Sequence, residues 1–327
     1  MSVVISLVSP VYREGEQVIR FLDAVESVLA PLDMEYEIIL VDDGSPDDTW
    51  THMRSEARKR GALRCLRLSR NFGKEAALVA GIEVAQGEAV ITLDSDLQHP
   101  PELIPEMIRV WQADEADVVE ARKEKRQRES LLDKFGAMLF YRAFSLFTSM
   151  DMEGAGDFKL MDRDVMEAWK NMPERGMFYR GMSAWLGFRR KEIMFTPRDR
   201  QHGKSKWSLS KKILLAVDSL TSFSAKPLTI IWVLSFLLIV FFLFVGGEAL
   251  WTYAGGRAVT GFTTVILLIL LTGSAILVSI CVLSVYIRQI FYESKARPRY
   301  LVSERAGYPD AAGKRGTRGK KGRTLCA

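Results

Sequence analysis

The chain has 327 residues, 48% of them hydrophobic, so it is long enough for one large domain or two smaller ones. The net charge of +5 arises at the C-terminal end, where residues 288–327 carry 11 Lys and Arg against three Asp and Glu. The rest of the chain is therefore slightly acidic, which argues against a nucleic-acid-binding body. The three cysteines have no metal-ligand spacing and form no even set, which excludes a disulfide framework.

The first 125 residues alternate short apolar runs with segments of helical spacing. Strands are expected at 3–10, 36–43, 63–69, 88–94 and 116–122, and helices at 15–29, 47–60, 74–86 and 101–112. Such an alternation predicts an α/β fold, with a mainly parallel sheet covered by helices on both faces. We expect this domain to occupy residues 1–226.

Polar side chains follow each of the five expected strands. In parallel sheets ligands bind at the carboxyl ends of the strands, so these side chains should converge on one edge. They are Tyr12, Glu14, Asp42, Asp43, Asn71, Lys74, Asp94, Asp96, Gln98 and Arg122. The loop after the first strand, "SPVYREGE", lacks the G-x-G-x-x-G pattern, and the sequence has no P-loop, so a nucleotide here must be held in another way.

Two long runs of uncharged residues follow, of 21 residues at 227–247 and 30 residues at 258–287. About 20 helical residues cross a hydrocarbon core of about 30 Å. We expect transmembrane helices at 227–249 and 262–287, joined by a short extracytoplasmic loop at 250–261. Two buried helices of a soluble core are the alternative.

Basic residues flank this expected hairpin on both outer sides, among them Lys211, Lys212 and Lys226 before it and Arg288, Lys295 and Arg297 after it. The positive-inside rule therefore places the domain of residues 1–226 and both termini in the cytoplasm, at the inner membrane. Residues 288–327 are expected to form a basic, largely disordered tail, which either lies against anionic lipid or is merely solvated. Two segments, about 130–150 and 207–226, have the spacing of amphipathic interface helices, with ordinary packing as the alternative.

Four segments, "SPVYREG", "ILVDDGSPDDT", "RNFGKEAAL" and "DSDLQHPPELIPEM", together resemble the GT-A glycosyltransferases of family 2. Later segments, such as "GAGDFKLMDRDV", "RDRQHGKSKW" and "YIRQIFYESKARPRYLV", resemble the polyprenyl-phosphate glycosyltransferases. That group includes the dolichol-phosphate mannose synthases and the bactoprenol glucosyltransferases used in O-antigen (lipopolysaccharide) modification. The resemblance covers about residues 3–302 and implies a GT-A, Rossmann-like catalytic domain.

The resemblance implies that Asp94 and Asp96 are the family's D-x-D motif. They would bind Mg²⁺ or Mn²⁺ that bridges the diphosphate of a nucleotide-sugar, with Gln98 as a third ligand, and Asp96 would count as catalytic. Read alone, D-S-D could equally be an Asx turn before a helix at Pro101. His99 stands where relatives often carry Asp or Asn.

Donor and acceptor residues follow from the same resemblance. Asp42 would bond the nucleobase, and Pro10, Tyr12 and Glu14 would form the nucleotide loop, although Tyr12 could simply pack. Lys74 would offset phosphate charge, unless it is a solvated surface lysine. The acceptor phosphate would be bound by Arg122, Lys134, Arg200, Ser205 and Lys206.

Asp157 matches a family aspartate taken as a base or as an acceptor-orienting carboxylate. The second pKa of a lipid phosphate is about 6, so the acceptor is already anionic at neutral pH and orientation is the better interpretation. A helix N-cap is the alternative for Asp157.

The expected reaction is inverting transfer of glucose from UDP-glucose to undecaprenyl phosphate on the cytoplasmic leaflet, giving a β-linked product. Mannose, N-acetylhexosamine and modified arabinose are alternative sugars. A separate flippase, a downstream transferase and a homo-oligomer such as a tetramer are implied. A processive polysaccharide synthase would need Q-x-x-R-W and more apolar runs, and a non-catalytic scaffold would have degraded motifs.

Overall fold

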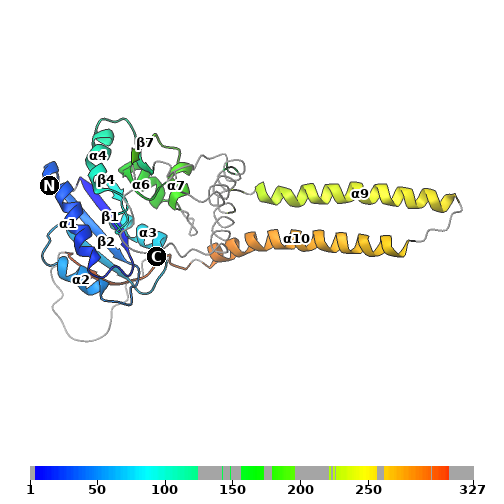
Figure 1. Cartoon of the computed structure of the whole chain (residues 1–327), viewed down its shortest axis with the longest axis horizontal. Coiled ribbons are helices and arrows are strands. Elements are labelled where there is room, and N and C mark those ends of the chain that lie inside the picture. Colours follow the sequence, from blue (N-terminus) through cyan, green and yellow to red (C-terminus); the bar gives the residue numbers. More distant parts are fainter. Residues whose placement is uncertain are drawn as a thin grey trace. The chain divides into compact units, whose positions relative to one another are not determined.

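The computed structural model of this chain describes residues 4–123, 142, 148, 156–172, 179–195, 221, 224, 226–255, 261–295 and 297–308. The chain forms two compact units (Figure 1). The first comprises Met1–Met138, Asp151–Lys206 and Arg297–Ala327, and the second Leu139–Met150 and Trp207–Ala296.

The first unit is built on a sheet of eight strands in the order β7-β5-β6-β4-β1-β2-β3-β8. β1 is parallel to β2 and β4, β2 to β3, and β5 to β7, whereas β6 runs antiparallel to β4 and β5, and β8 antiparallel to β3. Six of these strands therefore share one direction. Their bounds are β1 Ile5–Val11, β2 Tyr36–Asp42, β3 Leu63–Leu68, β4 Ala89–Thr92, β5 Val118–Lys123, β6 Lys159–Asp162, β7 Arg190–Phe195 and β8 Val302–Ala306.

Helices connect the strands and bury their apolar faces against the sheet. They are α1 Gln17–Leu29, α2 Thr49–Glu56, α3 Lys74–Val84, α4 Ile104–Gln112, α6 Arg163–Lys170 and α7 Tyr179–Trp185. α1 packs with α2 and α4, while α3 packs over β1 and β2. A Cβ at Gly81 would collide with the side chain of Val8, so glycine lets α3 approach β1 closely. This packing holds the first residue of α3, Lys74, near the ends of the central strands.

The sequence correctly predicts the first five strands, the helices between them and a mainly parallel sheet. The prediction of a disordered tail from residue 288 is wrong over residues 288–295 and 297–308. There, α10 continues to Ser294, and Val302–Ala306 forms β8 on the edge of β3. The cause is that the edge of β3 offers unpaired backbone groups, which a count of charges does not reveal. Residues 309–327 lie outside the described part of the chain.

The second unit contains two long apolar helices, α9 (Thr229–Ala254) and α10 (Phe262–Ser294), which pack against each other. Both are long and apolar enough to cross a membrane, over Ile231–Thr252 with mean hydropathy 2.4 and Leu268–Phe291 with 2.5. Large side chains such as Trp232 and Phe236 are exposed on them, unlike those of a core helix in a soluble protein. The expected interface segments lie almost entirely outside the described residues.

Candidate active site

A cleft of about 350 Å³ opens at the carboxyl ends of the central parallel strands. It is lined by the last residues of β1 and by residues that follow β1, β2, β3 and β4, namely Pro10, Val11, Tyr12, Glu14, Asp43, Asn71, Gly73, Lys74, Asp94, Ser95 and Asp96. The predicted convergence of strand-end side chains is thus seen for most of them. The volume of the cleft suits a small-molecule ligand.

Lys74 lies between two carboxylates on the wall of this cleft. Its Nζ is 2.6 Å from Asp94 Oδ1 and 2.5 Å from Asp157 Oδ2. Lys74 is the first residue of α3, Asp94 follows β4, and Asp157 precedes β6, so three elements meet at one ammonium group. The Lys74 side chain is 40% exposed, but it is paired with two carboxylates, and its role toward phosphate stays a prediction.

The cleft concentrates negative charge in a partly desolvated place. Burial raises the pKa of Asp94, and the nearby carboxylate of Asp157 adds to this, although Lys74 opposes it. Burial also raises the pKa of Glu14, with further contributions from Asp96 and Asp94. Burial alone would lower the pKa of Lys74, but the two carboxylates beside it raise that pKa above its ordinary value. The carboxylates therefore favour cationic ligands, and Lys74 stays charged.

Asp94, Asp96 and His99 place one possible ligand atom each within 4.8 Å of one another. Two carboxylates and an imidazole form a donor set that fits a divalent cation such as Mg²⁺ or Mn²⁺. His99 was not predicted as a ligand. Its imidazole is buried beside the rings of Phe158 and Phe195, at centroid distances of 5.7 and 5.5 Å.

The backbone and the side chain of Gln98 both donate hydrogen bonds to the carboxylate of Asp96. The backbone N–H of Gln98 donates to Asp96 Oδ1 over 3.1 Å, and the Gln98 amide donates to Asp96 Oδ2. The first bond is the Asx turn that the sequence left open as an alternative. Asp96 thus both shapes this turn and lines the cleft, and the role of Gln98 as a direct ligand stays a prediction.

Asp42, which was expected to bond the nucleobase, does not line the cleft, whereas its neighbour Asp43 does. Asp42 is fully buried and does not line the cleft; it accepts from the Ser45 N–H (2.9 Å) and pairs with Arg67 Nε (3.3 Å). Asp43 lines the cleft and accepts from the N–H groups of Phe72 (2.7 Å) and Gly73 (2.9 Å). Burial raises the pKa of both carboxyls. Asp43 is therefore the better placed of the two to meet a ligand.

The turn after Asp43 requires glycine. Gly44 has a φ of +66°, and a Cβ there would collide with the backbone of Arg70. This close approach brings the segment after β2 against the segment after β3, and the neighbouring Asp43 and Asn71 line the cleft.

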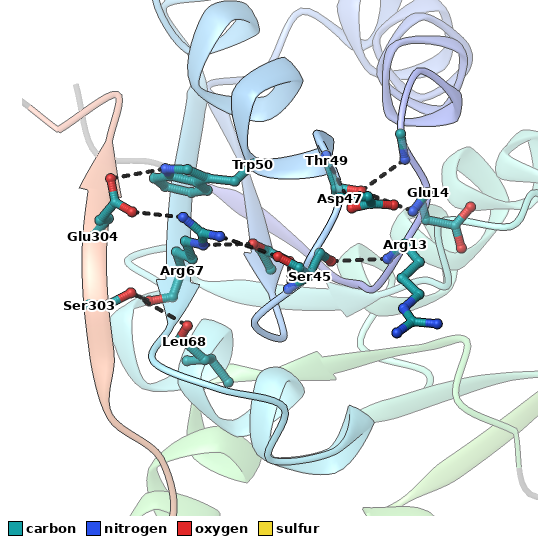
Figure 2. Close-up of polar contacts among 12 residues, drawn as sticks. Arg13, Glu14, Ser45, Asp47, Thr49, Trp50, Arg67, Leu68, Ser303 and Glu304 are labelled. Atoms are coloured by element: carbon teal, nitrogen blue, oxygen red, sulfur yellow. Dashed lines mark hydrogen bonds and ion pairs between the residues drawn. The ribbon is translucent and has the colours of Figure 1, made fainter.

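The loop after β1 is fixed by hydrogen bonds to the segment that follows Asp43 (Figure 2). The Arg13 N–H donates to Ser45 Oγ (3.0 Å), and the N–H groups of Glu14 and Gly15 donate to Thr49 Oγ1 (3.1 and 2.9 Å). Thr49 Oγ1 in turn donates to Asp47 Oδ1 over 2.6 Å. These bonds hold the cleft-lining Tyr12 and Glu14 in place, and Tyr12 is 40% exposed rather than packed in the core.

The acceptor residues are only partly described. Asp157 is not a helix N-cap, because it precedes the strand β6; its backbone carbonyl accepts from Thr92 Oγ1 over 2.6 Å. Arg122 is the penultimate residue of β5 and donates from Nη1 to Glu192 Oε2 on β7 over 2.8 Å, and it does not line the cleft. Lys134, Arg200, Ser205 and Lys206 lie outside the described residues.

Comparisons with known proteins show which family the chain resembles. The model of the family "Glycosyl transferase family 2" matches residues 6–169. An uncharacterized glycosyltransferase of Synechocystis is 38% identical, covering 93% of this chain and 96% of its own. The bactoprenol glucosyl transferase of Shigella phage SfX is 36% identical, covering 92% and 99%. A solved mannosyltransferase of Pyrobaculum calidifontis is 19% identical with a TM-score of 0.46, covering 86% of this chain and 88% of that one. The chain belongs to glycosyl transferase family 2 and has the GT-A fold.

Proposed function

We propose that this protein transfers glucose from UDP-glucose to a polyprenyl phosphate, with inversion of the anomeric configuration of the sugar. Within this class, we propose undecaprenyl phosphate as the acceptor. The observation that carries this proposal is the cleft in which Lys74 and a group of carboxylates face one another at the strand ends. The name of the phage relative, bactoprenol glucosyl transferase, supports both the sugar and the acceptor class.

On the donor side, the loop after β1 and the turn after β2 would bind the nucleotide. That part of the cleft is lined by Pro10, Tyr12, Glu14 and Asp43. Asp42 would stabilise the turn by accepting a hydrogen bond from the Ser45 N–H. The ammonium of Lys74 would bind a phosphate oxygen, because it is charged and lies at the cleft wall. In this assignment Asp42 acts on the nucleobase site only through its neighbours.

Asp94 and Asp96, with His99 beside them, would hold Mg²⁺ or Mn²⁺. A divalent cation there would neutralise the charge that develops on the departing nucleoside diphosphate. Gln98 orients the Asp96 carboxylate through its two hydrogen bonds. Lys74 keeps Asp94 turned toward the same space.

On the acceptor side, the polyprenyl phosphate needs orientation more than deprotonation, since its second pKa is about 6. Asp157 would supply this by fixing the direction of the Lys74 ammonium, which then lies between donor and acceptor. Arg122 would hold the acceptor phosphate with Glu192 setting its orientation, together with Lys134, Arg200, Ser205 and Lys206.

We further propose that α9 and α10 span the inner, cytoplasmic membrane as a hairpin, with the catalytic domain and both termini in the cytoplasm. The basic flanks outside the two helices support this orientation. The segments at about 130–150 and 207–226 would lie in the interface. A flippase and a periplasmic transferase would use the product. We also propose, from the family resemblance, that the protein assembles as a tetramer.

The donor is identified by a transfer assay with the full-length protein in detergent. Undecaprenyl phosphate is incubated with Mg²⁺ or Mn²⁺ and one radiolabelled donor at a time: UDP-glucose, GDP-mannose, UDP-N-acetylglucosamine or an activated aminoarabinose. Label in the lipid from UDP-glucose alone supports the proposal. Label from another donor would mean that the transferred sugar is not glucose. If the protein is folded and no donor labels the lipid, the proposed enzymatic function is contradicted.

A further inference from the structure

The strand β8 brings the C-terminal part of the chain back to the nucleotide side of the catalytic unit. It pairs antiparallel with β3, and in this register Glu304 lies opposite Arg67, next to a register shift between Arg67 and Leu68. Ser303 Oγ also donates to the carbonyls of Arg67 (3.1 Å) and Leu68 (3.4 Å) (Figure 2). Along the chain, β8 begins only a few residues after α10 ends.

The carboxylate of Glu304 is held by two donors from different elements. Arg67 Nη1, on β3, lies 2.9 Å from Glu304 Oε1, and Trp50 Nε1, on α2, donates to Glu304 Oε2 over 3.1 Å (Figure 2). Burial opposes ionisation of Glu304, but these two hydrogen bonds lower its pKa below the ordinary value. Glu304 is therefore an ionised group with a fixed direction.

Arg67 connects Glu304 to the turn that lies beside the cleft. Its Nη2 donates to the backbone carbonyl of Ser45 over 3.2 Å, and its Nε lies 3.3 Å from Asp42 Oδ2 (Figure 2). One planar guanidinium thus donates hydrogen bonds to Glu304 and Ser45 and forms an ion pair with Asp42, because its N–H groups form a rigid fork. Outside the turn, Glu304 bonds this fork and the Trp50 ring lies 5.9 Å from it, and of these two contacts Glu304 supplies the charge.

The turn that Arg67 holds is the turn that carries the nucleotide loop. The Ser45 N–H donates to Asp42, and Ser45 Oγ accepts from the Arg13 N–H. Asp43, within this turn, and Glu14, next to Arg13, both line the cleft. A continuous series of contacts therefore leads from Glu304 through Arg67 and Ser45 to the cleft wall.

We propose that Glu304 is a positioning residue for donor binding: it orients Arg67, which fixes the Asp42–Ser45 turn and with it the loop of Arg13 and Glu14. This role rests on the proposed function, in which that wall binds the nucleotide. This role of Glu304 makes the affinity for the donor depend on β8, the strand that follows the apolar helix α10 in the chain. Glu304 touches no substrate in this account and acts only through Arg67.

The test compares two substitutions on β8 in the full-length protein. Glu304→Gln keeps the size of the side chain and an acceptor for Trp50 but removes the charge that orients Arg67. Ser303→Ala, the matched control, removes a hydrogen bond to β3 without touching this charge. Three measurements are made on each variant: UDP affinity by calorimetry, the steady-state kinetics of sugar transfer, and hydrogen–deuterium exchange of residues 11–16 and 42–49.

For Glu304→Gln we expect UDP affinity to fall about fivefold, because the pair is half exposed and charge-assisted. The Michaelis constant for the nucleotide-sugar should rise by the same factor with little change in kcat. Exchange should accelerate in both segments, while Ser303→Ala and the wild type remain alike in all three measurements.

Two results would overturn this role. In the first, Glu304→Gln matches Ser303→Ala in affinity and in exchange. In the second, it lowers the melting temperature while the folded protein binds UDP normally, which would make β8 a structural edge strand only. If the wild type itself fails to bind UDP, the proposed donor is wrong, and the exchange of residues 11–16 and 42–49 still decides whether Glu304 positions the loop.

Discussion

The Lys74 ammonium lies 2.6 Å from a carboxylate oxygen of Asp94, the first acid of the D-S-D segment. Two aspartates one residue apart at the end of a buried strand repel each other unless a positive group lies near them. In this protein that group comes from the start of α3, and the same ammonium also pairs with Asp157. The pair thus links the region proposed for the donor to the residue proposed for the acceptor.

Replacing Lys74 by Met should reduce turnover by about 100-fold or more, because one preorganised charge at a reacting phosphate is worth several kcal/mol. Lys59→Met is the matched control, since Lys59 is also a partly exposed lysine paired with a carboxylate, Glu56. Both variants are assayed for sugar transfer under saturating acceptor. Equal activity of the two would remove Lys74 from the mechanism.

Asp94→Asn should raise the concentration of Mg²⁺ or Mn²⁺ needed for half-maximal activity by about tenfold to 100-fold, since a ligand is lost. Asp48→Asn is the control, because Asp48 is an exposed acid that pairs with His52 away from the cleft. His99→Phe, which keeps a ring between Phe158 and Phe195, should shift the Mn²⁺ requirement more than that of Mg²⁺, because Mg²⁺ binds oxygen ligands. Unchanged cation curves in all three variants would exclude this site.

Tyr179→Phe should lower the free energy of unfolding by about 1–2 kcal/mol, because its hydroxyl is a buried hydrogen-bonding group. That hydroxyl lies 2.7 Å from Thr92 Oγ1, which donates to the backbone carbonyl of Asp157. We therefore also expect kcat to fall while the Michaelis constant for the donor stays the same. A loss of stability with normal kcat in the remaining folded enzyme would show that Tyr179 only packs.

Glu56 should make the fold sensitive to acid. Hydrogen bonds from Lys59 and Arg60 lower the pKa of Glu56 below its ordinary 4.5, although burial opposes this. The unfolded chain then binds more protons than the folded one, so this stabilisation is present above pH 4.5 and is lost as pH falls through the folded pKa. Glu56→Gln should therefore melt lower than the wild type at pH 7 and lose less stability below pH 4.5.

The control for this acid sensitivity is Glu88→Gln, at an exposed position. Its melting temperature should follow the wild type over the whole pH range. Parallel curves for the wild type and Glu56→Gln would show that the contacts of Glu56 with Lys59 and Arg60 contribute nothing to stability.

Hydrophobic periodicity was sufficient for the central sheet, because buried parallel strands and their helices have local patterns. β1 to β5 lie close to their expected positions. β8 could not be predicted in this way, since "VSERA" is short and charged and exists as a strand only because the β3 edge binds it. The same holds for β6, which is four residues long and lies between β4 and β5.

The site was predictable at the level of strand ends but not of individual side chains. Whether Asp42 or Asp43 faces the cleft depends on the alternation of the strand and on the turn at Gly44, and adjacent residues point to opposite sides. His99 enters the possible cation site from a loop with no regular spacing. For Asp157, the sequence could not reveal the ammonium of Lys74, which is 83 residues away in the chain.

The central claim is inverting transfer of glucose to a lipid phosphate, and the chemical structure of the product tests it most directly. The full-length protein is incubated with UDP-glucose, undecaprenyl phosphate and Mn²⁺, and the extracted lipid is examined by phosphorus and proton NMR. We predict a glucosyl phosphate lipid with a β-anomeric linkage, which disappears in Asp96→Asn. An α linkage, or free glucose and UDP without a glycolipid, would contradict the account.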